Sequence, residues 1–172
     1  MKNNRTIYLV TGALIAALYA GLTYFSAVWG LAYGFVQFRI SEALTILPIL
    51  TPAAVPGLIV GCFIGNLGSP YGIVDIVCGT LATAIAAVAT RMLRGVRFKN
   101  IPWLAPLAPV LFNALIVGAE ITFLIPDSIA SFTGFLITAG WVALGELVVC
   151  YGLGLPLGMV LEKNKVLKVS NM

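Results

Sequence analysis

The chain has 172 residues, of which 60% are hydrophobic and only 9% are charged, and its mean hydropathy is +1.05. This composition exceeds what a soluble core requires and is typical of a membrane protein that crosses the bilayer several times. Histidine is absent, which removes the commonest general base and metal ligand. The three cysteines, Cys62, Cys78 and Cys150, lie inside apolar runs and are expected to be buried thiols rather than disulfides or metal ligands.

Apolar runs of helical length follow one another along the whole chain, and helices satisfy their own backbone groups in lipid. The first run is long enough to span the bilayer and lacks a small-residue cleavage site, so we expect a retained helix rather than a signal peptide. We expect one all-α membrane domain, 1–172, with helices over residues 6–27, 42–50, 53–67, 73–92, 103–125 and 132–161.

The run "PILTPAAVPG" contains three prolines within nine residues, and prolines at this density end or kink helices. Nine of the ten basic residues lie in three clusters, 2–5, 91–99 and 163–168, which the positive-inside rule places in the cytoplasm. The chain must then cross an even number of times between successive clusters. This requires two short helices with a turn near Thr51 and Pro52, and it predicts a six-helix bundle with both termini cytoplasmic.

The segment "GFVQFRIS" alternates apolar and polar side chains, so it can run extended as a lid, with Gln37, Arg39 and Ser41 on one side. Arg39 is the one base outside the clusters, and the topology places it on the external side. Ser41 is a candidate N-cap that leaves Glu42 in the first turn of the next helix. The structural interpretation is an Arg39–Glu42 ion pair together with the cap, and the functional one is that Gln37, Arg39 or Glu42 faces a ligand; the two are compatible.

Three carboxylates, Asp75, Glu120 and Glu146, fall in the outer half of the predicted spans. Carboxylates inside a membrane are costly and mark functional sites by default. Asn113 precedes Glu120 by seven residues, so both side chains can point to one interior. The alternatives are that Glu120 reaches the interface or pairs with Arg39, and that Asp75 caps its helix. Because the polar groups are confined to the outer half of the predicted spans, we expect a binding site that opens to the outside rather than a proton or ion path through the bilayer.

Trp29 follows the first predicted helix, and Trp141 lies nine residues into the last one. Either ring could stack on an aromatic ligand whose polar edge meets the carboxylates. The alternative is an ordinary interfacial belt of aromatic residues.

The first predicted helix presents two adjacent rows of small residues, which allow another helix to approach closely. Two rows form a face wide enough for a partner protein, although internal packing is a rival explanation for either one. The rows are Gly12, Ala16 and Ala20, and Ala13, Ala17 and Gly21.

The stretches "TGALIAALYAGLTY", "VQFRISEALTILPILTPAAVPGLIVGCFIGN" and "GIVDIVCGTLATAIAA" resemble the QueT family of substrate-binding S components of energy-coupling factor (ECF) transporters, and the resemblance covers nearly the whole chain. It implies a bacterial plasma-membrane protein that captures a queuosine precursor, a planar 7-deazaguanine base, from outside. It also implies docking of the alanines on the first helix, Ala13, Ala16, Ala17 and Ala20, onto a transmembrane coupling protein served by two cytoplasmic ATPases. No cofactor is implied, and this chain has no phosphate-binding loop of its own.

A carboxylate can accept the two adjacent N–H donors of a guanine-like edge. The predicted depth of Glu42, Glu120 and Glu146 in the membrane, together with their negative charge, favours these three residues for that role. Two other functions remain: an S component for another vitamin-like solute, and an autonomous carrier or channel. The confinement of polar groups to the outer half and the lack of an evident inverted repeat both argue against the carrier or channel. An intramembrane enzyme is disfavoured, because the sequence has neither histidine nor a Gly-x-Ser-x-Gly elbow. The net charge of +4 requires no nucleic-acid partner, given where the bases lie.

Overall fold

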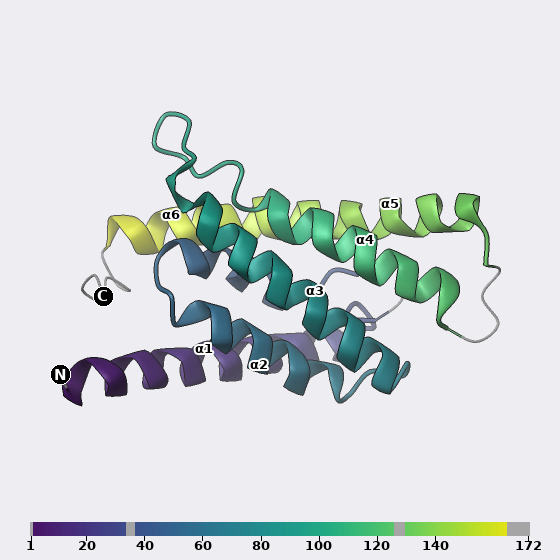
Figure 1. Ribbon diagram of the computed structural model, residues 1–172, viewed down its shortest axis with the longest axis horizontal. Helices are drawn as coiled ribbons and strands as arrows, with labels where there is room; N and C mark the ends of the chain where they lie inside the picture. Colours follow the sequence, from purple (N-terminus) through teal and green to yellow (C-terminus); the bar gives the residue numbers. More distant parts are fainter. Residues whose placement is uncertain (1, 34–36, 126–129, 165–172) are drawn as a thin grey trace.

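The structure is a computed structural model that describes residues 2–33, 37–125 and 130–164, and all of its named elements are helical (Figure 1). The prediction of an all-helical fold is confirmed. In chain order the elements are α1 (Lys2–Val28), η1 (Ile40–Ile49), α2 (Ala54–Asn66), α3 (Ile73–Met92), η2 (Leu93–Gly95), α4 (Leu107–Phe123), α5 (Phe132–Val149), η3 (Cys150–Gly154) and α6 (Leu155–Lys163).

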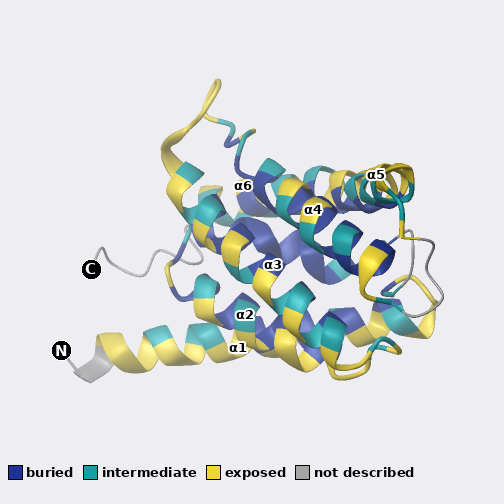
Figure 2. Ribbon diagram, turned by 45° about the vertical axis from the view of Figure 1, so that its right-hand side comes forward, coloured by how far each residue is buried: buried dark blue, intermediate teal, exposed yellow. Residues whose placement is uncertain are grey.

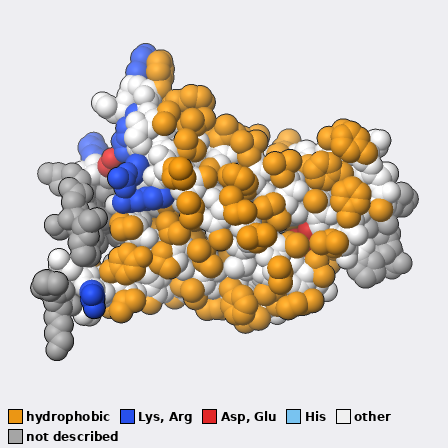
Figure 3. All heavy atoms as spheres, viewed as in Figure 1, with side chains coloured by type: hydrophobic (Ala, Val, Ile, Leu, Met, Phe, Trp, Pro, Cys, Tyr) orange, Lys and Arg blue, Asp and Glu red, His pale blue; other side chains and the backbone are white. Residues whose placement is uncertain are grey.

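Three helical runs are long and apolar enough to cross a membrane: Asn4–Val28, Ile73–Gly95 and Phe132–Lys163. Three shorter apolar helices accompany them, and they coincide with η1, α2 and α4. Large hydrophobic side chains cover the middle of the molecule, while lysines and arginines gather at one end (Figure 3). An apolar surface of this extent on helices of this length is that of a membrane protein.

The start of α1, the end of α6 and the connection 93–106 lie together at one end of the bundle, here named the basic end (Figure 1). The turn 67–72, the end of α4 and the start of α5 lie at the other end, here named the opposite end. The structure thus places the described parts of all three basic clusters on one side. Six crossings and a cytoplasmic basic end remain predictions.

The element η1 runs through the centre of the bundle, and Ser41 to Ile49 are all buried. It is a ten-residue 3₁₀ helix, which rises about 2 Å per residue and so spans about 20 Å, against about 15 Å for an α-helix of that length. Its first N–H, of Ile40, donates to Ser26 Oγ at 3.0 Å near the end of α1. Near its other end, Pro48 O accepts from Arg91 Nη1 at 2.9 Å at the end of α3.

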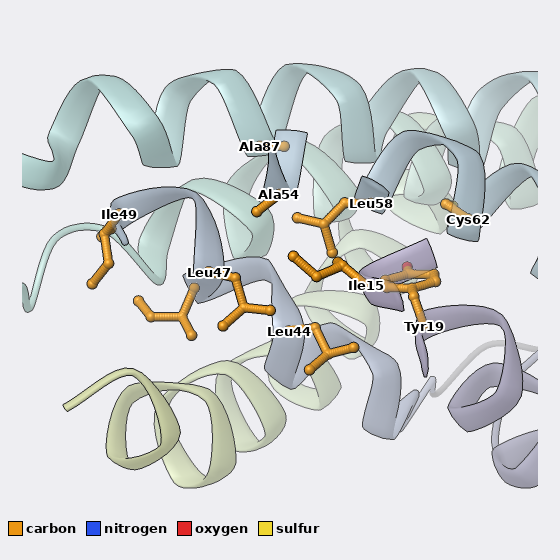
Figure 4. Close-up of a cluster of buried hydrophobic side chains, with 11 residues drawn as sticks. Ile15, Tyr19, Leu44, Leu47, Ile49, Ala54, Leu58, Cys62 and Ala87 are labelled. Atoms are coloured by element: carbon orange, nitrogen blue, oxygen red, sulfur yellow. The ribbon is translucent and has the colours of Figure 1, made fainter. Parts of the chain in front are cut away.

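Apolar side chains of η1 form the main core with residues of α1 and α2. Figure 4 shows Leu44 and Leu47 of η1 beside Ile15 of α1 and Leu58 of α2. The buried sides of the surrounding helices face this central element (Figure 2). The core therefore depends on one of the shorter apolar helices of the chain.

The predicted break in the proline-rich run is present, because a turn at 50–53 separates η1 from α2. The prediction that Ser41 caps a helix is wrong. The helix begins at Ile40, Arg39 occupies the N-cap position without a side-chain cap, and Ser41 Oγ accepts from Thr23 Oγ1 at 2.8 Å. A buried hydroxyl must find a partner wherever the fold provides one, and here tertiary contact outweighs local capping.

Several helix boundaries differ from the predicted ones, and α1 already begins at Lys2 rather than at residue 6. The helix α4 begins at Leu107 rather than 103, because Pro102 and Pro106 interrupt the start of the run. The last helix contains one π-helical turn, η3, between α5 and α6. Pro156 has no N–H to donate to the carbonyl of Gly152, so the regular α pattern cannot pass through this turn.

One of the two small-residue rows of α1 packs inside the molecule. A Cβ on Gly57 of α2 would lie 2.6 Å from Gly12 O, and one on Gly61 would lie 2.8 Å from Ala16 O, so the two backbones are nearly in contact. Ala16 and Ala20 are buried.

The expectation that both rows together form a partner surface is therefore corrected, because α2 covers the first row. The second row, Ala13, Ala17 and Gly21, is exposed.

Candidate ligand-binding site

Buried polar side chains meet near the start of η1 in two groups, each named after its residue from this segment. The Arg39 cluster consists of Arg39, Asn66, Asp75 and Glu120, and the Glu42 cluster consists of Tyr19, Glu42, Asn113, Glu146 and Cys150.

In the Arg39 cluster, the guanidinium is held by several groups at once. Nε donates to Ala32 O at 2.6 Å, Nη1 donates to Asn66 Oδ1 at 3.1 Å, and Nη2 lies 3.6 Å from Asp75 Oδ2. The ring of Tyr33 lies against the guanidinium, with its centroid 5.2 Å away. Asn66 Nδ2 donates to the backbone oxygen of Asp75 at 3.1 Å. Arg39 thus ties the segment before η1 to α2 and α3.

This arrangement decides between the alternatives left by the sequence. The ion-pair partner of Arg39 is Asp75, rather than Glu42 or Glu120. Asp75 is not a cap, because Gly72 occupies the N-cap position of α3 without a side-chain cap bond. As the third residue of α3, Asp75 still has the favourable field of a helix N-terminus.

The Glu42 cluster joins four elements, α1, η1, α4 and the α5–η3 run. The hydroxyl of Tyr19 donates to Glu42 Oε1. Asn113 Nδ2 donates to Glu146 Oε1 at 2.7 Å, and Cys150 Sγ donates to Glu146 Oε2 at 3.4 Å. Both oxygens of Glu146 therefore have donors, whereas Glu42 Oε2 has none among the described residues.

Glu120 is only 1% exposed, and neither of its carboxylate oxygens has a hydrogen-bond donor in the described chain. The two oxygens of Asp75 also lack such donors, but Asp75 forms the ion pair with Arg39. The charged groups that interact with Glu120 electrostatically are Asp75 and Arg39, which places it at the Arg39 cluster. Buried polar atoms in native proteins nearly always have partners, and an unpartnered one calls for a specific explanation. Oε2 of Glu42 and both carboxylate oxygens of Glu120 can therefore accept hydrogen bonds from the N–H donors of a ligand.

Six of the predicted site residues are brought together by the fold, and Gln37 is also buried, with its backbone against Gly145 of α5. The six are Arg39, Glu42, Asp75, Asn113, Glu120 and Glu146. The extended lid is described only from Gln37 onward, and its polar residues Gln37 and Arg39 face inward. Residues 34–36 lie outside the described chain.

Neither predicted aromatic residue lies with these groups. Trp29 is 69% exposed and Trp141 is 48% exposed, so stacking of a buried ligand on these rings is not supported. Exposed tryptophans suit the alternative of contact with the lipid interface. The buried aromatic ring at the site is Tyr19, which is 0% exposed.

Tyr19 and Asn66 are site residues that the sequence analysis missed. A signal for Tyr19 existed, since Tyr19, Thr23 and Ser26 recur at helical spacing on one side of an apolar helix. All three cysteines are free, and Cys62 and Cys150 are buried as predicted, whereas Cys78 is only half-buried. The two buried thiols also hydrogen-bond: Cys62 Sγ, for example, accepts from Thr83 Oγ1 at 3.1 Å. Their role is thus partly polar, because buried hydroxyl and amide donors need acceptors.

The chain matches the family model of the QueT transporter over residues 9–163, a range that contains every member of both clusters. It belongs to the QueT transporter family. A relative from Lactococcus lactis subsp. cremoris (strain MG1363), named queuosine precursor transporter QueT, is 33% identical over 149 residues, covering 85% of this chain and 87% of the relative. No solved structure matches the chain.

Proposed function

We propose that this member of the QueT family is the S component of an ECF importer and that it binds a 7-deazaguanine precursor of queuosine from outside the cell. The single observation that supports this best is a pair of buried carboxylates with three oxygens that lack hydrogen-bond donors in the described chain: both oxygens of Glu120 and Oε2 of Glu42. Family membership and the name of the Lactococcus relative support the choice of cargo.

The base would bind by its hydrogen-bonding edge. A guanine-like edge offers adjacent N–H donors, and a carboxylate with both oxygens open can accept two of them. Glu120 has both oxygens open, and Glu42 has one. The hydrogen-bonded pair Asn113 and Glu146 would line the site, and Tyr19 would supply its buried aromatic ring. The Arg39–Asp75 ion pair and the buried Gln37 would hold the segment before η1 in place.

In this proposal the chain is not an enzyme, and ATP is hydrolysed by two cytoplasmic ATPases that act through a transmembrane coupling protein. The exposed row Ala13, Ala17 and Gly21 on α1 is the docking surface for that protein, because its small side chains allow close approach. The chain would cross the bacterial plasma membrane six times with its basic end in the cytoplasm. Nucleic acid has no part in the function.

The test is calorimetric titration of the purified chain in detergent with 7-cyano-7-deazaguanine and 7-aminomethyl-7-deazaguanine, with folate and thiamine as controls. Saturable binding of at least one deazaguanine, and of neither control, is expected. Absence of binding in protein shown to be folded would refute the cargo. Uptake by the chain alone in liposomes, without ATPases, would instead favour an autonomous carrier.

A further inference from the structure

The connection between α3 and α4 forms a small hairpin at the basic end, with Lys99 and Asn100 at its tip. The backbones of Phe98 and Ile101 exchange two hydrogen bonds, N to O in each direction, at 3.0 and 2.9 Å. Lys99 and Asn100 both have positive φ, 49° and 66°, as the two central residues of a type I′ turn do. The hairpin thus has a defined shape that presents Lys99 at its tip, although positive φ is uncommon for a lysine.

Two of the four bases between residues 91 and 99 already have partners. Arg97 Nε donates to Arg94 O at 3.2 Å, and Nη1 donates to Asn100 O at 3.4 Å. The same guanidinium pairs with Glu162 at the end of α6, at 2.9 Å between Nη2 and Oε1. Arg91 is held by a backbone oxygen of η1, 2.9 Å from its Nη1. These two bases therefore fasten the hairpin and its base to the bundle.

The other two bases, Arg94 and Lys99, are exposed, and neither side chain has an ion pair or hydrogen bond to any described residue. The ammonium group of Lys99 lies 5.7 Å from the centre of the Phe98 ring. Arg94 interacts electrostatically with Arg91, and these like charges repel each other. Anionic groups beside the hairpin would offset this repulsion and would give both free bases a partner.

The hairpin adjoins an apolar side of the bundle. A stripe of exposed apolar side chains runs along one face of α3 toward it, at the spacing of successive helical turns. The stripe consists of Leu81, Ile85, Val88 and Met92. Phe98 and Trp103 add aromatic rings that are 65% and 47% exposed. Figure 1 and Figure 2 both show the connection 93–106 extending away to one side of the bundle, which is where lipid headgroups surround a membrane protein.

We propose that this hairpin binds anionic phospholipids of the leaflet at the basic end. Arg94 and Lys99 bind the phosphate groups, while Phe98 and Trp103 lie at the boundary between headgroups and acyl chains. Aromatic rings favour this boundary, and anionic lipids attract lysine and arginine next to it. The stem of a lysine can lie along apolar surface while its ammonium group reaches the phosphate layer. The site is separate from both buried clusters and does not depend on the cargo.

The test uses Trp103 as a reporter in the full chain, reconstituted in bilayers of phosphatidylcholine. The chain has three tryptophans, and Trp29→Phe with Trp141→Phe leaves only Trp103. Brominated lipids quench tryptophan fluorescence on contact, so we compare small mole fractions of brominated phosphatidylglycerol and brominated phosphatidylcholine. The anionic lipid is expected to be favoured about fivefold or more, since each base near an anionic surface contributes about that factor. High salt is expected to weaken the preference.

The control for position is a chain that keeps only Trp29, which follows α1 at the end away from its basic first turn. No preference for the anionic lipid is expected there. Equal quenching of Trp103 by the two lipids would overturn the inference and would favour a protein partner for this surface. It would leave the proposed function standing, because titration with deazaguanines tests the buried site separately.

Charge-removing variants of the Trp103 chain then locate the contact. Arg94→Gln with Lys99→Gln is expected to abolish the preference, whereas Lys99→Arg is expected to keep it, because the charge remains. The matched control is Arg5→Gln, which removes an exposed base of α1 at the same end of the molecule. An unchanged preference in the double variant, or an equal loss with Arg5→Gln, would overturn the assignment to the hairpin.

Discussion

Arg39 and Asp75 show how two charges inside the bundle depend on each other. Their side chains are 4% and 2% exposed, and each compensates a charge that would be costly alone in this environment. The net stabilisation from a buried ion pair is often small, but removal of one partner is expensive because the other charge remains buried. The pair therefore contributes more to the placement of the segment before η1 than to total stability.

Arg39→Gln is expected to lower the free energy of unfolding by about 3–5 kcal/mol, because it leaves the Asp75 carboxylate without its cation. The double variant Arg39→Gln with Asp75→Asn is expected to recover part of that loss, because the amides can hydrogen-bond without charge. Denaturation of the detergent-solubilised protein measures both. Losses that simply add in the double variant would contradict the coupling.

At the scale of elements, glycines determine how closely α1 and α2 approach. A Cβ on Gly61 would lie 2.8 Å from Ala16 O, which is backbone and cannot move aside cheaply. Gly140 of α5 has nothing within 4 Å of the corresponding position. The same substitution therefore has different consequences on the two helices.

Gly61→Ala is expected to destabilise the protein by about 1–3 kcal/mol through overpacking. Gly140→Ala is the matched control, and it is expected to be neutral or to stabilise by up to about 1 kcal/mol, because alanine is the better helix former. Thermal unfolding in detergent compares them. Equal effects of the two substitutions would show that α1 and α2 are not in close contact.

The exposed row of α1 is tested by Ala17→Trp, since a large side chain prevents close approach of a partner helix. Ligand binding by the isolated chain is expected to be unchanged, while uptake in cells that contain a complete transporter is expected to be lost. The control is Val88→Trp on α3, where Val88 is 48% exposed and belongs to neither row. Normal uptake with Ala17→Trp would remove this row as the docking surface.

At the scale of the whole molecule, the arrangement of the two ends makes the topology testable. The turn 67–72 lies at the opposite end from the connection 93–106 (Figure 1). The lysines and arginines visible on the surface gather at the basic end, which the positive-inside rule assigns to the cytoplasm (Figure 3). Ser69 and Lys99 are therefore suitable sites for a probe on each side.

In a background with Cys78→Ser, which leaves only the buried Cys62 and Cys150, an introduced Ser69→Cys is expected to react with a membrane-impermeant maleimide in intact cells. Lys99→Cys is expected to react only after the cells are permeabilised. The background without an introduced cysteine is the control. The reverse pattern of labelling would invert the predicted topology.

The number and order of the helices could be predicted from sequence because lipid forces each segment to satisfy its own backbone hydrogen bonds. The proline-rich break near Thr51 and Pro52 was predictable for a similar reason, since proline cannot continue a helix there. The packing of side chains between helices could not be predicted from these local rules. Ser41 had every local property of a cap, yet its hydroxyl pairs with Thr23 of α1.

By itself, the sequence determined a helical membrane protein of the QueT family with most of its polar groups near one end. Only the tertiary structure decided which of these groups meet, as with Arg39 and Asp75 or Asn113 and Glu146, and which row of α1 is covered. The physical reason is that the sequence does not determine how each helix is rotated about its own axis. In a bilayer both the lipid-facing and the core-facing sides of a helix are apolar, so the pattern of hydrophobicity does not specify which side faces inward.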